Sequence, residues 1–367
     1  MPHVPIDTPT GAIELHYEIA TPTSHSSPTI DAQLPCILFL HAGYAAQEIF
    51  ELQFCDPRLR TQFNLIGVDM RAYGSTKGSI GQEEYGPADS ADDIYRFIKA
   101  LDLPPVHIFG LAIGCCVGLE LAATHPDLVL SLTLCSPLPA AEPEDIAAGR
   151  LEVYHLWVEA FNHDGSDSQP VDGDSAVLQD LLHGAQQLAF NNESNQVIDA
   201  MSRNALDQAI RNRAGTPAKL KESYQASVGW FLNRRPQSRE ALAKIKCSIC
   251  LIHCEDDIAY PLRYTQELEE QLRDAGIRHV GLCEIPGPHY GNVVNPQAIN
   301  PILLEHALSA SSAKQTGSAP RYMPDFNDPE RQQQNGQQDC QKMVTPFTET
   351  LAQYGYDPQA TDDDCDC

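Results

Sequence analysis

Short, continuous apolar runs alternate with amphipathic segments along most of this chain. Such runs are typical of strands buried on both faces of a sheet. Segments with apolar residues at helical spacing predict helices that cover the sheet. The predicted strands are 36–40, 63–69, 106–109, 128–135, 248–253 and 279–285, with 11–20 as an edge strand, and the predicted helices are 88–101, the segment after 112, 261–275 and 296–308.

This alternation predicts an α/β fold with a mostly parallel, doubly wound sheet, because strand–helix–strand units connect through right-handed crossovers. The pattern changes between 137 and 236, where helical segments occur without a buried strand. These segments are 144–161, 176–190, 195–211 and 218–232, and the polar stretch 163–175 interrupts them. We expect the insertion to be a helical cap over the carboxyl edge of the sheet.

The predicted domain organisation has four parts: core residues 1–136, the cap 137–236, core residues 237–309, and an acidic tail 310–367. The tail is polar and of low complexity, so it buries too little apolar surface to offset the entropy of ordering and is expected to be disordered. The apolar patch 343–351 is the exception and is a candidate short helix or docking segment.

Composition narrows the function classes. A net charge of −26 leaves no basic surface for nucleic acid or for anionic membranes. No apolar run approaches the length of a membrane helix, and no secretory signal is visible. The 12 cysteines have no framework spacing, which indicates reduced thiols in the cytoplasm. Cys247 and Cys250 fit a buried strand better than a metal site, and no cofactor motif appears, so we expect neither metal nor cofactor.

The segment 106–122, VHIFGLAIGCCVGLELA, carries the most specific pattern in the chain. A strand pattern ends at Gly110, a helical pattern begins after Ala112, and Gly114 completes the spacing of a G-x-S-x-G nucleophile elbow. The position of the serine holds Ala112, whose methyl group cannot attack a carbonyl. The chain therefore has the sequence of a serine-hydrolase turn without its nucleophile.

Three further motifs occur with the elbow in a characteristic order. His41-Ala42-Gly43 follows the first buried strand, the segment 69–75 (DMRAYGS) follows the second, and Asp257 and His289 follow the last two. Together these motifs resemble the α/β-hydrolase superfamily over residues 11–308, with the helical insertion as the cap after the sixth strand. The chain order of nucleophile, acid and histidine is that of this family.

The resemblance implies roles for particular residues. His289 would be the catalytic base and Asp257 its orienting acid, with Asp256 and Glu255 as rivals for the acid. The oxyanion hole would consist of backbone N–H groups from Ile113 and from Ala42 or Gly43. We interpret His41, Asp69 and Arg71 as structural residues. Cys115 and Cys116 are alternative nucleophiles, but they start three and four residues past the turn and fit core packing better.

Two function classes remain open. An Asp–His base opposite an oxyanion hole can still activate water or deprotonate a carbon acid without a covalent intermediate. The favoured hypothesis is thus a hydrolase-like or lyase-like enzyme acting on a small, lipophilic metabolite in a capped pocket. The alternative is a catalytically inactive homologue that binds a ligand or a partner. The sequence does not indicate the oligomeric state.

Overall fold

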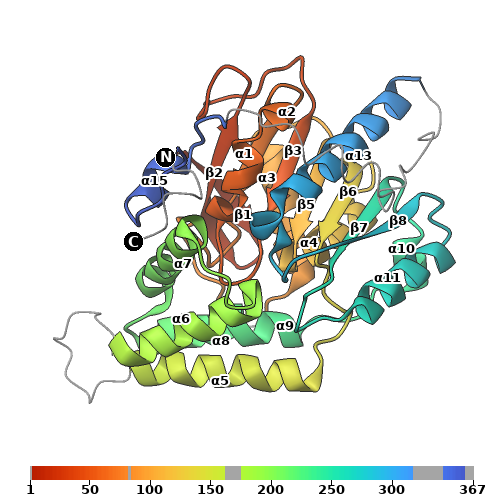
Figure 1. Ribbon diagram of the computed structural model, residues 1–367. Helices are drawn as coiled ribbons and strands as arrows, with labels where there is room; N and C mark the ends of the chain where they lie inside the picture. The colour runs from red at the N-terminus through yellow and green to blue at the C-terminus, as the bar shows by residue number, and fades with distance from the viewer. Residues whose placement is uncertain (1, 82–83, 162–174, 317–341, 360–367) are drawn as a thin grey trace.

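The computed structural model describes residues 2–81, 84–161, 175–316 and 342–359. Within these residues an eight-stranded sheet runs through the molecule in the order β1-β2-β4-β3-β5-β6-β7-β8 (Figure 1). The strands are β1 (His3–Thr8), β2 (Gly11–Ala20), β3 (Cys36–Leu40), β4 (Asn64–Val68), β5 (Val106–Leu111), β6 (Val129–Cys135), β7 (Ser248–Cys254) and β8 (Val280–Ile285).

The pairings confirm the predicted mostly parallel sheet. β1–β2 and β2–β4 are antiparallel, and the remaining neighbours from β4 to β8 are all parallel. Every residue of β3, β4, β5 and β7 is buried, which explains their continuous apolar runs. The expected edge position of β2 is wrong, because β1 lies outside it. The carboxyl ends of β3, β5, β7 and β8 all meet at one edge.

Helices cover both faces of the sheet. On β6, Leu132 and Leu134 face Gly118 of α4 (Ile113–Thr124), whereas Thr133 hydrogen-bonds His306 of α13 (Pro296–Thr316). Because neighbouring strand residues point to opposite faces, α4 and α13 lie on opposite sides of the sheet. The other core helices are α3 (Pro87–Ala100), α10 (Arg239–Leu242), α11 (Leu262–Asp274), η1 (Gln47–Phe50), α1 (Glu51–Phe54), α2 (Pro57–Arg60) and α12 (Gly291–Val294).

The helical insertion follows β6, the sixth strand, as predicted, and most of it lies across one end of the strands, at the bottom of the view in Figure 1. It contains α5 (Glu144–Phe161), α6 (Ser175–Phe190), α7 (Gln196–Arg213), α8 (Pro217–Tyr224), the π-helical turn η2 (Gln225–Gly229) and α9 (Trp230–Leu232). A small cluster around Trp157 and Phe161 packs α5 against neighbouring cap helices. Most of the polar stretch expected at 163–175 lies outside the described residues.

The tail differs from the expectation of disorder over 310–367. Residues up to Thr316 continue α13, and residues 342–359 dock on the core through α15 (Thr348–Ala352). Phe347 and Leu351 are buried, and the Phe347 ring lies 4.9 Å from that of Phe54. The hydroxyl of Thr345 donates to the buried carboxylate of Glu51. The predicted docking segment is therefore confirmed, and the remainder of the tail lies outside the described residues.

Candidate active site

Ala112 occupies a sharp turn between β5 and α4. Its backbone angles, φ 50° and ψ −106°, are unfavourable for a residue that carries a Cβ atom. A Cβ added to Gly110 would lie 2.7 Å from the backbone of Gly114, and one added to Gly114 would lie 2.0 Å from the carbonyl oxygen of Leu40. Both glycines are therefore required by close backbone approach. The turn has the shape of a nucleophile elbow, and its central residue carries only a methyl group.

His289 and Asp257 form a buried hydrogen-bonded pair at the carboxyl edge of the sheet. Nδ1 of His289 lies 2.6 Å from Oδ2 of Asp257. The other oxygen of Asp257 accepts backbone N–H bonds from Ala259 and Tyr260, at 3.0 and 2.9 Å. With its carboxylate fixed in this way, Asp257 holds Nδ1 as the protonated nitrogen and leaves the lone pair on Nε2.

The two rival acids have other positions. Asp256 is exposed, and its side chain accepts the backbone N–H of Gly287 at 3.1 Å, which fixes the loop before His289. Glu255 is also exposed. Of the three neighbouring carboxylates, Asp257 is thus the one hydrogen-bonded to the imidazole.

The imidazole of His289 packs between two tyrosines. The rings of Tyr260 and Tyr290 lie 5.2 and 5.3 Å from it, and the side chain is 4 % exposed. Across the described residues, Nε2 has no hydrogen-bond partner, in contrast to Nδ1. A buried ring that is fixed on one side and unpaired on the other can accept a proton from a bound water or substrate.

The loop after β3 is fixed from both ends. Nδ1 of His41 donates to the carbonyl of Ala42 at 2.7 Å, and Nε2 accepts the backbone N–H of Met70 at 2.9 Å. His41 therefore has the structural role predicted for it, and burial lowers its pKa. Because a peptide unit is planar and trans, the N–H of Gly43 points away from the carbonyl held by His41. The hydroxyl of Tyr290 donates to the carbonyl of Gly43 and brings the His289 segment to this loop.

The elbow adjoins the same loop. A Cβ added to Gly43 would lie 3.8 Å from Cγ2 of Ile113 and 2.9 Å from Cζ of Phe231. Ile113 is the first residue of α4, so its backbone N–H has no acceptor within the helix. The segments that carry Gly43, Ile113 and Tyr290 are consequently in direct contact. This contact gathers the predicted oxyanion donors and the histidine segment in one place.

Asp69 and Arg71 stabilise the turn after β4, as predicted. Asp69 accepts hydrogen bonds from His16, from the backbone of Gln47 and from Ser75, at 2.6, 3.0 and 2.8 Å. Burial is the largest single influence on Asp69 and opposes its ionisation, but the hydrogen bond and charge of His16, the charge of His41 and the backbone N–H of Ser75 together lower the pKa of the carboxyl group. Arg71 makes a buried, two-point ion pair with Asp93 on α3. The hydrogen bonds of both side chains within the described residues therefore serve the framework of this turn.

The cysteines near the turn are poor nucleophiles. The thiol of Cys115 donates to the carbonyls of Gly110 and Cys135, both at 3.2 Å, and burial raises its pKa well above the ordinary value. Burial also raises the pKa of Cys116, to about 11. Because the thiolate is the reactive form, these geometries support the structural interpretation of both residues.

An ionic cluster next to His289 was not predicted from the sequence. Glu142 pairs with Arg150 through one oxygen and with Arg234 through the other, and all three side chains are buried. Tyr260 joins it, accepting from Arg150 at 2.9 Å and donating to Glu142 at 3.0 Å. The guanidinium of Arg150 lies 3.4 Å from the ring centroid of Phe231, which in turn packs on Gly43. The cluster thus links cap helix α5 to the site. Its residues are far apart in the sequence, so no sequence motif contains them.

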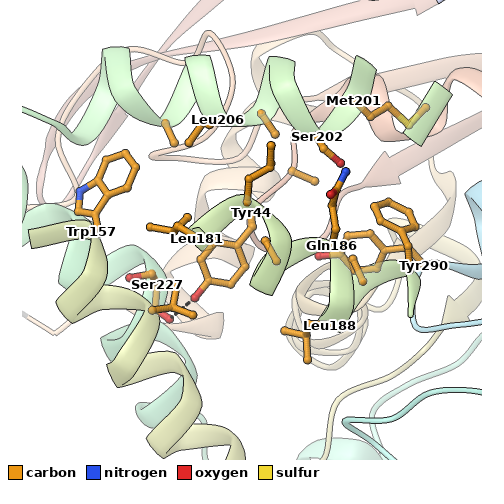
Figure 2. A pocket seen from close by; sticks show the side chains of 18 of the residues that line it. Tyr44, Trp157, Leu181, Gln186, Leu188, Met201, Ser202, Leu206, Ser227 and Tyr290 are labelled. Carbon is orange, nitrogen blue, oxygen red and sulfur yellow. Dashed lines mark hydrogen bonds between the residues drawn. The ribbon is translucent and has the colours of Figure 1, made fainter. Parts of the chain in front are cut away.

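A pocket lies beneath the cap, between α5, α6 and α7 and the loop after β3. Figure 2 shows Tyr44 between Trp157 at one end and Tyr290 at the other. The cavity measures about 100 Å³ and its lining is mostly apolar, as predicted for a capped pocket. Its lining includes Tyr44 and Tyr290, the chain neighbours of Gly43 and His289, but neither Ala112 nor His289. This pocket therefore adjoins the loop of Gly43 and the His289 segment on the side of the cap.

The match to a family model covers residues 35–214 and is described as the alpha/beta hydrolase fold. A "Putative carbamate hydrolase RutD" from Agrobacterium fabrum is 24% identical over 301 residues, covering 81% of this chain and 99% of that protein. A protein of the same name from a Caulobacter species is 24% identical and covers 79% and 95% of the two chains. No helix among the described residues is both long and apolar enough to cross a membrane.

Solved structures agree on the fold. A thermophilic esterase from Thermogutta terrifontis aligns with a TM-score of 0.61 at 17% identity, over 84% of this chain and 99% of the esterase. An enol-lactonase from Burkholderia xenovorans aligns with a TM-score of 0.59 at 16% identity, over 80% and 96% of the two chains. The chain therefore has the α/β-hydrolase fold.

Proposed function

We propose that this protein is an enzyme that hydrolyses a small molecule, with His289 as general base on water and Asp257 as its orienting acid. The observation that carries the proposal is the buried 2.6 Å bond between Nδ1 of His289 and Asp257, which leaves Nε2 without a partner among the described residues. His16, also 4 % exposed, has the same form, with Nδ1 on Asp69 and Nε2 unpaired, but it lies at the structural turn after β4. His289 differs in its place, because its neighbour Tyr290 binds the carbonyl of Gly43 in the loop that adjoins the elbow.

In the proposed reaction, Nε2 of His289 takes a proton from water as the oxygen attacks the substrate's carbonyl carbon. The N–H groups of Ile113 and of Ala42 or Gly43 would stabilise the oxyanion that forms. Such a donor contributes about 3 kcal/mol in related acyl chemistry. When the tetrahedral intermediate collapses, the imidazolium returns the proton to the leaving group. Asp257 stays ionised and stabilises the imidazolium.

Ala112 excludes the covalent route that a serine would open at this turn. We propose that the turn is a degenerate nucleophile elbow, whose retained glycines still present the N–H of Ile113. The hydrolase names of the relatives favour hydrolysis over a lyase reaction, although the same base could deprotonate a carbon acid. The pocket lined by Tyr44 and Tyr290 supports binding of the substrate's body beneath the cap.

One observation favours a second candidate, an inactive homologue that binds a ligand. The pocket is lined by Tyr290 rather than His289, and Phe231 packs on Gly43 where an oxyanion would approach. A ligand could occupy the apolar cavity without contact with the imidazole. Turnover distinguishes the two functions, whereas ligand binding does not.

We also propose a cytoplasmic location. The nine cysteines within the described residues are all free thiols, and eight of them are buried. Unpaired cysteines in this number fit a reducing compartment.

The test is hydrolysis of a panel of p-nitrophenyl carbamates and esters by the wild-type chain, by His289→Gln and by His183→Gln. His183 is an exposed cap histidine and serves as the control. General-base catalysis of this kind contributes about 10²–10⁴-fold, so His289→Gln should lose that factor while His183→Gln keeps the wild-type rate. Equal rates for the wild-type and His289→Gln proteins would reject the proposal.

A further inference from the structure

The last residue of α7, Arg213, carries a buried guanidinium with an unusual set of partners. The residue is 6 % exposed, and its one side-chain hydrogen bond to the described residues runs from Nη1 to the carbonyl of Ala72, at 3.1 Å. Its guanidinium lies 5.1 Å from the ring centroid of Tyr73. No acceptor for Nε occurs in the described part of the chain, and no carboxylate there lies within 4.0 Å of Arg213.

The other buried arginines show what Arg213 lacks. Arg71 pairs with the carboxylate of Asp93, and Arg150 pairs with that of Glu142. Arg60 has no carboxylate, but all three of its guanidinium nitrogens donate to the carbonyls of Thr21 and Val344. A buried cation normally requires a paired charge or a full set of acceptors, because desolvation costs several kcal/mol. Arg213 has neither of these among the described residues.

Among the residues that the structure describes, no anion compensates the charge of Arg213. Burial is the main influence on its pKa and lowers it, and the titratable groups that act on it are the phenols of Tyr73 and Tyr44. Burial raises the pKa of Tyr73 to about 12, so this phenol is neutral at physiological pH. The positive charge of Arg213 is therefore left uncompensated by these neighbours.

Arg213 lines the pocket beneath the cap. The polar groups that share this lining include Ser223 and Ser227, whereas most of the remaining wall is apolar. Figure 2 shows Leu181, Leu206 and Met201 along the cavity, which ends at Tyr290. The pocket thus combines a cation that lacks a counterion with an apolar wall leading toward the His289 segment.

We propose that this pocket binds a small carboxylate with an apolar body, and that Arg213 is the residue that recognises the carboxylate. Nη1 is bonded to Ala72, and Nε is buried without an acceptor among the described residues, so the edge formed by Nε and Nη2 can pair with a planar oxyanion once the neighbouring side chains admit it. A guanidinium edge matches the two oxygens of a carboxylate in a bidentate arrangement. The apolar body would lie along Leu181 and Leu206. Placing the reacting group near Tyr290 rests on the proposed function, but binding of the carboxylate does not.

Calorimetric titration of the full chain tests this inference. The probes are ω-phenylalkanoates with two to five methylene groups, their neutral amides and inorganic phosphate. The proteins are wild type, Arg213→Gln and Arg211→Gln, whose arginine is exposed on the same helical turn. We expect the best carboxylate to bind wild type at least tenfold more tightly than its amide. Arg213→Gln should abolish this preference and Arg211→Gln should keep it.

Several results would overturn the inference that Arg213 recognises a carboxylate. Equal binding of acid and amide, no binding of any carboxylate, or tighter binding of phosphate than of every carboxylate would overturn the inference. A carboxylate preference that persists in Arg213→Gln would also overturn it.

Thermal unfolding supplies a second, independent readout. If the charge of Arg213 serves a ligand, Arg213→Met without ligand should melt at or above the wild-type temperature, because a desolvated charge is removed. A large fall in melting temperature would assign Arg213 to the fold instead.

The same titration of His289→Gln separates the two proposals. A carboxylate preference retained in His289→Gln, with no wild-type turnover, would reject the proposed function and leave this inference standing. Turnover that requires His289, without any preference for a carboxylate, would support the proposed function and reject this inference.

Discussion

Substituting serine for Ala112 adds one oxygen atom at the centre of the candidate site. The position is 3 % exposed and already has φ 50°, so the serine needs no further change of backbone conformation. The new hydroxyl is buried and needs a partner. The acceptor that the proposed site supplies is Nε2 of His289, which has no hydrogen bond to the described residues.

The stability of Ala112→Ser reports on this partner. A buried hydroxyl left without a hydrogen bond lowers the free energy of unfolding by about 1–3 kcal/mol. If Nε2 of His289 accepts the hydroxyl proton, the loss should be offset to within about 1 kcal/mol. We therefore expect urea unfolding to show Ala112→Ser near wild type, and the serine variant to lose about 1–3 kcal/mol when His289→Gln is added.

Its kinetics give a larger signal. In a comparable triad, loss of the serine costs about 10⁶-fold in kcat, so restoring a serine to an aligned base and oxyanion hole should raise the rate well above background. We expect p-nitrophenyl acetate hydrolysis to rise at least about 10²-fold, with an initial burst as acyl-enzyme accumulates. Ala112→Gly, which relaxes the backbone without adding oxygen, is the control. A folded Ala112→Ser that is destabilised and shows no burst would refute the proposed alignment.

Three further predictions concern the framework of the site. Phe347→Ala should lose about 3–5 kcal/mol of unfolding free energy in urea, whereas Val344→Ala, at 58% exposure, should change it by less than about 0.5 kcal/mol; equal effects would contradict docking of the tail. Burial raises the pKa of the Glu51 carboxyl from 4.5 to about 7. The protonated carboxyl therefore stabilises the folded protein fully below pH 4.5, and this stabilisation is lost as the pH rises to 7. Glu51→Gln should remove about 3 kcal/mol of the pH dependence of the unfolding free energy, and an unchanged pH profile would contradict the raised pKa of Glu51. Gly114→Ala should lose more than about 2 kcal/mol through overpacking, while Gly149→Ala, which has open space, should gain about 0.5–1 kcal/mol; a neutral Gly114→Ala would show that the turn is not tightly packed.

The parts of the fold that could be predicted are those that short-range patterns specify. The run 36–40 is buried on both faces and became β3 with the predicted bounds. The cap helix predicted at 144–161 also has its predicted bounds. By contrast, β1 was missed, because His3–Thr8 contains a proline and pairs only with β2 at the edge of the sheet.

The candidate site likewise has residues that motifs predict and residues that they do not. The elbow glycines and the Asp257–His289 pair could be placed by motif and chain order, and the structure gives them contacts to match. The partners of Glu142 and Arg213 could not, because they come from segments that only tertiary folding brings together. The packing of Phe231 on Gly43 is likewise a contact that periodicity does not encode.

The central claim is that His289 and Asp257 act as one catalytic unit without a nucleophile at residue 112. A double-mutant cycle on kcat/KM tests it most directly, using the best substrate of the aryl carbamate and ester panel with His289→Gln, Asp257→Asn and the double variant. The account predicts that His289→Gln alone loses nearly all of the effect, so that adding Asp257→Asn costs almost nothing more. Losses that multiply in the double variant, or a wild-type rate in His289→Gln, would contradict it.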